Sequence, residues 1–245
     1  MLDRLFPSLR AFVRAFALAS PGGSAIESDG TCAGIVPVMP DRSVVNAVVY
    51  EDAAALERLI PELVSGYEAA GVRAWGAWLR PGDERAARAL AAAGSSVDSE
   101  PMAMAMELGG VEAPGPGELD LVGDPSPAAV SEVLMPVYEW GGFEEAMRWF
   151  GGYHPYLALA DGRPAGTLGV YDHEGDAYVT WVGTTEEARG RGLASTLLRR
   201  ALADARERGC TTTTLVATRM GQPVYARLGY RELGRVQLWE RRTPA

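Results

Sequence analysis

Seven consecutive residues, Arg189 to Ser195 (RGRGLAS), have the composition of an anion-binding loop and lie where a predicted strand passes into a predicted helix. The first backbone N–H groups of a helix have no hydrogen-bond partner within it. Gly190 and Gly192 have no side chains that could shield these groups. An anion can therefore approach these groups closely and meet the positive end of the helix dipole. Because Arg189 and Arg191 add positive charge, the segment predicts a diphosphate-binding site.

Two common nucleotide-binding loops fit this segment less well. Gly190 to Ser195 resembles the dinucleotide fingerprint Gly-x-Gly-x-x-Gly but ends in serine. It also lies near the end of the chain, where too few residues remain for the parallel strands of a dinucleotide-binding sheet. A P-loop needs Gly-Lys followed by Ser or Thr, which the segment does not contain.

The elements around the loop follow from hydrophobic periodicity and turn residues. The helix predicted over 192–208 has an apolar stripe that must lie against a sheet, and Gly209 ends it. Short turns of Asp and Gly between the three strands before it predict an antiparallel meander. The stripe consists of Leu193, Leu197, Leu198, Ala201, Leu202 and Ala205. The neighbouring elements are strands over 156–160, 165–171, 177–182 and 211–217, a short helix over 223–228 and a strand over 236–240.

A Gly-, Pro- and acid-rich stretch over 107–127 divides the chain into two halves. We expect an N-terminal half over 1–112, a linker over 113–127 and a C-terminal domain over 128–245. The C-terminal domain opens with a helical stretch from Ala128 to about Trp149, broken at Gly141-Gly142. The first half is predicted to contain strands over 43–49, 74–79 and 102–108 and helices over 52–70 and 82–93.

The two halves end in a similar pattern. ARALAAAGSSVDSEPMAMAMEL and PVYARLGYRELGRVQLWER each place a short helix, a glycine, a turn and a last strand in the same order. The similarity is one of pattern and not of residues, and it predicts a faint internal repeat.

Composition favours a soluble, globular protein. The 245 residues are 47% hydrophobic, and the net charge of −9 argues against a nucleic-acid partner, which needs a basic face. The first 20 residues carry charges among apolar positions and predict an amphipathic helix rather than a signal peptide or a membrane span. Cys32 and Cys210 form neither a disulfide framework nor a zinc spacing, so we expect a cytoplasmic protein without a metal.

Residues 117–245 resemble the GCN5-related N-acetyltransferase (GNAT) superfamily. Arg189 to Ala194 fits the pattern Arg/Gln-x-x-Gly-x-Gly/Ala, and AYVTWVGT, TTTTLVAT and GQPVYARLGYRE stand in the family's order around it. The resemblance implies a mixed α/β (α+β) fold of the acyl-CoA N-acyltransferase type, with a mostly antiparallel central sheet flanked by helices. The first half has no such loop, so the resemblance implies a tandem protein with a degenerate N-terminal half.

By this resemblance the co-substrate is acetyl-CoA or another acyl-CoA. Its diphosphate is expected to bind backbone N–H groups of the loop, and its pantetheine arm to pair with a strand edge. N–H groups near Val182 would face the thioester oxygen and stabilise the oxyanion. The expected binding residues are Val182, Gly183, Thr184, Arg189, Gly190, Arg191, Gly192, Leu193, Ala194 and Ser195.

Three residues are candidates for proton transfer. Tyr225 occupies the position of the family's general acid, which protonates the departing thiolate, although it could instead pack on the last strand. Asp176 lies where some family members carry a catalytic glutamate, but acidic residues are also ordinary in such a turn. Glu139 lies at the helical break and could hold or deprotonate an amine, or could be a solvated helix carboxylate.

Large aromatic residues gather around the helical break and the glycine pairs that follow it. They could line a pocket for an apolar or aromatic amine, or could pack helices on the sheet. The set is Tyr138, Trp140, Phe143, Trp149 and Tyr153.

The leading hypothesis is an N-acetyltransferase that transfers an acetyl group to a small amine by direct attack in a ternary complex. The alternatives are a non-catalytic acyl-CoA-binding or sensor protein and a protein N-acetyltransferase. The expected partner is a small-molecule amine, without nucleic acid or membrane, and a homodimer is compatible with the sequence.

Overall fold

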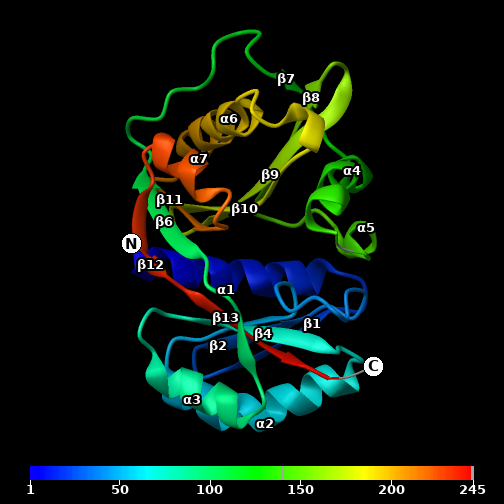
Figure 1. Cartoon of the computed structure of the whole chain (residues 1–245), viewed down its shortest axis with the longest axis vertical. Helices are drawn as coiled ribbons and strands as arrows, with labels where there is room; N and C mark the ends of the chain where they lie inside the picture. Colours follow the sequence, from blue (N-terminus) through cyan, green and yellow to red (C-terminus); the bar gives the residue numbers. More distant parts are fainter. Residues whose placement is uncertain (140, 244–245) are drawn as a thin grey trace. The chain divides into compact units, whose positions relative to one another are not determined.

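The computed structural model describes residues 1–139 and 141–243, which divide into two compact units (Figure 1). Unit 1 comprises Met1–Ser8, Met102–Glu144 and Gly151–Leu233. Unit 2 comprises Leu9–Pro101, Glu145–Phe150 and the C-terminal residues from Gly234. Each unit is built around one sheet.

The sheet of unit 1 has seven strands in the order β12-β6-β11-β10-β9-β8-β7. Its strands are β6 (Met102–Glu107), β7 (Asp120–Leu121), β8 (Tyr153–Ala160), β9 (Arg163–His173), β10 (Asp176–Thr184), β11 (Thr212–Ala217) and β12 (Arg231–Arg235). Its helices are α4 (Pro127–Tyr138), α5 (Phe143–Ala146), whose last two residues belong to unit 2, α6 (Leu193–Glu207) and α7 (Gln222–Arg227).

The sheet of unit 2 has six strands in the order β1-β2-β3-β4-β13-β5. They are β1 (Ser24–Ser28), β2 (Thr31–Ile35), β3 (Ala47–Val49), β4 (Ala74–Leu79), β5 (Ser96–Ser99) and β13 (Gln237–Arg242). The helices are α1 (Leu2–Ala19), whose first residues belong to unit 1, α2 (Ala53–Ala69) and α3 (Glu84–Ala92). The helix predicted for the first 20 residues is therefore confirmed.

The faint repeat is confirmed as α3–β5–β6 and α7–β12–β13. In the first copy, β5 lies in the sheet of unit 2 and β6 in the sheet of unit 1; in the second copy, β12 lies in the sheet of unit 1 and β13 in the sheet of unit 2. β6 pairs with β11 in unit 1, with Thr212 opposite Glu107, and β13 pairs with β4 and β5 in unit 2. Because of this strand exchange, the compact units differ from the segments expected over 1–112, 113–127 and 128–245. The segment 102–112 belongs to unit 1, and residues from Gly234 belong to unit 2.

The antiparallel meander predicted for unit 1 is confirmed by its turns. Asp161-Gly162 joins β8 to β9, and Glu174-Gly175 joins β9 to β10. All four residues have positive φ angles, from 47° to 79°, as two-residue hairpin turns require. The hairpin of β1 and β2 in unit 2 is closed in the same way by Asp29-Gly30, a signal that the sequence contained and the prediction missed.

Each sheet contains one parallel pair joined by a helix, β3 and β4 through α2 and β10 and β11 through α6. In unit 1 the parallel pairing ends at Val179 and Leu215. β10 then continues to Thr184 alongside β9, and β11 continues to Ala217 alongside β6. The two strands therefore separate, and the edge of β10 beyond Val179 is not paired by β11.

Opposite faces of the unit 1 sheet are covered by α4 and α6. A Cβ on Gly183 would lie 2.9 Å from a methyl group of Leu134 in α4. A Cβ on Gly166, which is opposite Thr184, would lie 2.9 Å from a methyl group of Leu193 in α6. Because consecutive strand residues point to opposite faces, the two helices lie on different sides. Figure 1 shows α6 and α7 together on one side of this sheet.

The apolar stripe predicted for α6 is buried as expected. Leu197, Leu198, Ala201, Leu202 and Ala205 belong to the core of unit 1, and Leu193 packs against it. In the part of the chain that the structure describes, no helix is long and apolar enough to cross a membrane.

Candidate acyl-transfer site

The loop predicted to bind a diphosphate leads directly into α6. A short 3-10 turn (Glu186–Ala188) follows β10 in the chain, and Gly192 is the N-cap of α6. Gly190 and Gly192 have φ angles of 75° and 77°, which L residues rarely adopt, so glycine is required here by conformation as well as by access. A Cβ at either position would meet no atom within 4 Å, so both glycines border open space.

The N-terminus of α6 has no side-chain cap. Gly192 provides no side-chain hydrogen bond, and the first turn, which holds Leu193, Ala194 and Ser195, contains no acidic residue. The positive end of the helix dipole is therefore not neutralised by the chain's own carboxylates, as an anion site requires.

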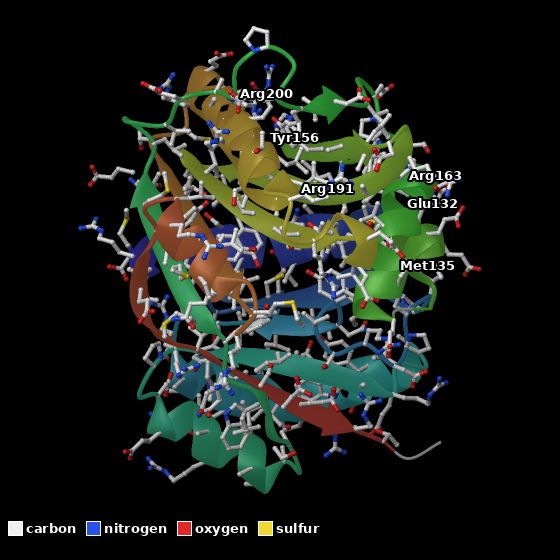
Figure 2. The ribbon with its side chains drawn as sticks, turned by 45° about the horizontal axis from the view of Figure 1, so that its top comes forward. Glu132, Met135, Tyr156, Arg163, Arg191 and Arg200 are labelled. Carbon is white, nitrogen blue, oxygen red and sulfur yellow. The ribbon has the colours of Figure 1, made fainter. Side chains whose placement is uncertain are left out.

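Both arginines of the loop are exposed and have weak local partners. Arg191 lies 3.1 Å from a carboxylate oxygen of Asp161, and Arg189 donates a hydrogen bond of 3.3 Å to the Thr184 carbonyl. Figure 2 shows Arg191 at the start of α6 and Arg200 farther along it. Exposed ion pairs of this kind contribute about 0–1 kcal/mol, so an incoming diphosphate can displace them at little cost.

A polar network holds the other end of α6 on the sheet. Arg208, just after the helix, donates two hydrogen bonds of 2.6 and 3.0 Å to Asp172 of β9. Tyr156 of β8 donates to Asp204 of α6 at 3.0 Å. His154, also on β8, lies 3.2 Å from Asp172. These contacts fix the helix, and with it the loop at its N-terminus.

A β-bulge lies on β10 where the strand has separated from β11. Thr180 is opposite Gly169 and Gly183 is opposite Thr167, so two residues of β10, Trp181 and Val182, face one residue of β9. Trp181 has a φ of 51°, which for a bulky residue costs about 1–3 kcal/mol.

Aromatic rings hold the strained Trp181 in place. The ring of Phe143 contacts the Trp181 ring edge to face at a centroid distance of 5.2 Å, and Tyr153 does so at 5.6 Å. All three side chains are buried. The interpretation that Phe143 and Tyr153 are packing residues is therefore supported, and both pack on the bulge through Trp181.

The other three aromatic residues predicted around the helical break are Tyr138, Trp149 and Trp140. Tyr138, the last residue of α4, donates a hydrogen bond of 2.9 Å to the Val182 carbonyl. Trp149 belongs to unit 2, and Trp140 lies outside the described residues. The sequence placed Tyr138 near a substrate pocket, but nothing in its local pattern indicated a contact with a strand 44 residues later.

Tyr225 lies on α7 with its ring buried against Tyr230 at 5.7 Å. The Tyr230 hydroxyl shares a 2.9 Å hydrogen bond with Thr213, and both side chains are buried. Burial raises the pKa of Tyr225 well above its ordinary value of 10, and the neighbouring Tyr138 raises it further. The phenol is therefore protonated at neutral pH, as a proton donor must be, and the raised pKa makes it a weaker acid than an exposed tyrosine.

Asp176 begins β10 and is buried in a cage of three hydroxyl groups. Ser8 and Thr214 donate to its Oδ2 at 2.8 and 2.6 Å, and Thr212 donates to its Oδ1 at 2.8 Å. Trp181 lies five positions farther along the strand, a distance of about 16 Å along β10. The structure does not bring Asp176 to the bulge, and its surroundings fit a structural role linking β10, β11 and the start of α1.

Glu139 is the C-cap of α4 and is exposed, with a φ of 53°. Its backbone N–H donates to the Met135 carbonyl and ends the helix. Glu139 directly follows Tyr138, which contacts the bulge. Of the two predicted carboxylates, Glu139 is therefore the one whose chain neighbour contacts the bulge.

The corresponding helix of unit 2 has a different N-terminus. Asp52 is the N-cap of α2, and its carboxylate accepts a hydrogen bond of 3.0 Å from the Ala55 N–H. Only three residues, Tyr50 to Asp52, join β3 to α2, and two of them are acidic. A carboxylate already occupies the position that a phosphate would take.

Residues 127–230 match the sequence model of the acetyltransferase (GNAT) family. This segment is therefore similar in sequence to members of that family. The match contains α4 through α7, and so includes the loop, the bulge and Tyr225. GNAT proteins are acetyltransferases and typically use acetyl-CoA as co-substrate. No curated protein sequence matches the chain.

Solved structures show that the GNAT-like fold extends over both units. A GCN5-related N-acetyltransferase from Kribbella flavida has 20% identity and a TM-score of 0.69, with 98% of this chain and 96% of that chain covered. A putative GNAT acetyltransferase from Novosphingobium aromaticivorans has 18% identity and a TM-score of 0.59, covering 95% and 99%. A tandem GNAT protein from the clavulanic acid biosynthesis pathway has 16% identity and a TM-score of 0.59, covering 99% and 96%.

Among residues 1–139 and 141–243, no group of three His, Cys, Asp or Glu side chains could hold a metal ion.

Proposed function

We propose that the protein is an N-acetyltransferase that transfers the acetyl group of acetyl-CoA to the amine of a small molecule. The observation that carries this proposal is the uncapped N-terminus of α6 next to the separated, bulged edge of β10. One element provides donors for an anion, and the other provides a strand edge that β11 does not pair beyond Val179.

The loop residues bind the diphosphate in this proposal. Backbone N–H groups from Arg189 to Ser195 donate to it, and the two arginine side chains exchange Asp161 and the Thr184 carbonyl for phosphate oxygens. Val182, Gly183 and Thr184 then pair with the pantetheine arm as an added strand would.

The residues around the bulge carry out the transfer. Backbone N–H groups near Val182 stabilise the negative charge on the thioester oxygen as a neutral amine attacks the carbonyl carbon. The C–N bond forms, the C–S bond breaks, and Tyr225 donates its proton to the departing thiolate. The proton lost by the amine passes to water or to Glu139, which we keep as the candidate base.

Unit 1 alone holds this site in the proposal. The Asp52 carboxylate at the N-terminus of α2 accepts from the Ala55 N–H and repels a diphosphate. Unit 2 is accordingly a degenerate half that retains the fold without the acyl-CoA site.

A product assay tests this function. The protein is incubated with acetyl-CoA and separate amine classes: polyamines, amino acids, aromatic amines and peptides with a free N-terminus. Free thiol release and the mass of the acetylated product are both measured. Acetylation of a small amine supports the proposal. Acetylation of peptides alone would indicate a protein N-acetyltransferase, and tight binding without any product would indicate a sensor.

A further inference from the structure

Two strained residues flank a single hydrogen bond in unit 1. Among the described residues, five non-glycine positions have positive φ angles, and three of them belong to hairpin turns followed by glycine. The other two are Glu139, directly after Tyr138, and Trp181, directly before Val182. The Tyr138 hydroxyl donates to the Val182 carbonyl at 2.9 Å.

This hydrogen bond occurs where β11 no longer pairs with β10. The parallel pairing ends at Val179, so the Val182 carbonyl is bonded by a side chain instead of by a neighbouring parallel strand. Because the peptide group is planar and trans, fixing the Val182 carbonyl also fixes the direction of the Gly183 N–H. Tyr138 thus controls the orientation of a peptide group within the bulge.

The position of Tyr138 is itself tightly set. α4 ends at this residue, and the Glu139 N–H closes the helix on the Met135 carbonyl at 2.8 Å. One turn earlier, Leu134 packs on Gly183, where an added Cβ would lie 2.9 Å from its terminal methyl group. α4 therefore cannot shift without losing contacts at both positions.

We propose that Tyr138 is a positioning residue of the acyl-transfer site, whose hydroxyl holds the bulge in the conformation that polarises the thioester carbonyl. This inference rests on the proposed function. Trp181 and Glu139 adopt unfavourable backbone conformations at the two ends of this contact, and the hydrogen bond, together with the rings of Phe143 and Tyr153, maintains them.

Tyr138→Phe removes only the hydroxyl and therefore tests the role directly. Tyr67→Phe is the matched control, because it removes a buried hydroxyl that also donates to a strand carbonyl, that of Gly34, but in unit 2. Acetyl-CoA labelled with carbon-13 at the thioester carbonyl is bound to each protein, and its carbonyl stretching frequency is recorded by difference infrared spectroscopy. Titration calorimetry gives the affinity of each variant, and thermal unfolding verifies that each is folded.

In the parent and in Tyr67→Phe, the carbonyl frequency should fall relative to free acetyl-CoA. In Tyr138→Phe the shift should be at least halved while the dissociation constant changes by less than about threefold, since the diphosphate contacts remain. With an accepted amine, kcat should fall about tenfold with little change in KM, as expected when a catalytic hydrogen bond is misaligned but not removed.

An unchanged carbonyl shift in Tyr138→Phe would overturn the inference and leave the proposed function standing. A parent protein that does not bind acetyl-CoA would overturn the proposed function and the inference together. If Tyr138→Phe were too unstable to measure, Phe143→Leu, which loosens the same bulge through Trp181, should reduce the shift in its place, and an unchanged shift there would also overturn the inference.

Discussion

Gly192 and Asp52 occupy the same position in the two units, the N-cap of the helix that joins the two parallel strands. Asp52 closes its helix with a carboxylate, whereas Gly192 leaves the helix open and adopts a φ of 77°. We therefore propose that this single position distinguishes the unit that binds a diphosphate from the unit that does not.

Replacing Tyr225 with phenylalanine should slow the chemical step and preserve cofactor binding. The variant keeps the ring on Tyr230 and loses the proton that is donated to the thiolate, so kcat should fall about 10²-fold or more. The matched control is Tyr230→Phe, whose hydroxyl bonds to Thr213 in the core and should affect stability more than turnover. Equal turnover in the parent and Tyr225→Phe would remove this tyrosine from the mechanism.

Asp176→Asn should weaken the fold more than the chemistry. The amide replaces one of two oxygens that together accept three hydroxyl hydrogen bonds, so the free energy of unfolding should fall by about 1–3 kcal/mol. Urea denaturation measures this change, and kcat of the folded variant should stay within about threefold of the parent. A stable variant without turnover would instead identify Asp176 as the general base predicted from the sequence.

Alkaline pH should destabilise unit 1 through its buried phenols. Burial raises the pKa of Tyr138 to about 12, against an ordinary value of 10. Its contribution is complete below pH 10 and is lost as the pH rises through 12, because the unfolded chain releases the proton first. By pH 12 the loss from this group is about 2 kcal/mol.

Urea denaturation between pH 8 and 12 checks this prediction, with Tyr138→Phe as the comparison. The variant should lose less stability than the parent over this range. Identical losses in both proteins would show that Tyr138 ionises equally easily in the folded and unfolded states.

The exchanged strands predict that the two sequence halves do not fold separately. A fragment over 113–245 lacks β6, which lies between β11 and β12, and a fragment over 1–112 lacks β13, which lies between β4 and β5. Each fragment alone should be largely unfolded by circular dichroism, and co-expression should restore a folded complex. A fragment over 113–245 that unfolds cooperatively by itself, with β13 in the place of β6, would contradict this prediction.

Local patterns predicted the elements that carry the site. The Asp-Gly and Glu-Gly turns, the apolar stripe of α6 and the glycines of its N-terminal loop each depend on neighbouring residues, so they could be predicted from the sequence. The strand 74–79 was predicted with the bounds of β4. The strand 43–49 was predicted too long, because only Ala47–Val49 pairs with neighbouring strands.

Long-range pairing explains what the sequence did not predict. β6 contacts β11 across more than 100 residues, and neither strand's alternation indicates its partner. The bulge at Trp181 was also missed, since AYVTWVGT reads as an uninterrupted strand. Asp176 was predicted in the turn just before the strand and is the first residue of β10, and the three hydroxyl groups around it come from distant segments.

Titration calorimetry with acetyl-CoA tests the central claim most directly, with NADH and ATP as competing ligands and Gly192→Glu as the variant. The control is Gly82→Glu, a glycine of unit 2 with a φ of 76° and equally open surroundings. The parent and Gly82→Glu should bind acetyl-CoA selectively, and Gly192→Glu should not bind it, because its carboxylate lies where the diphosphate binds. Absent acetyl-CoA binding in the parent, or equal binding by Gly192→Glu, would contradict the account.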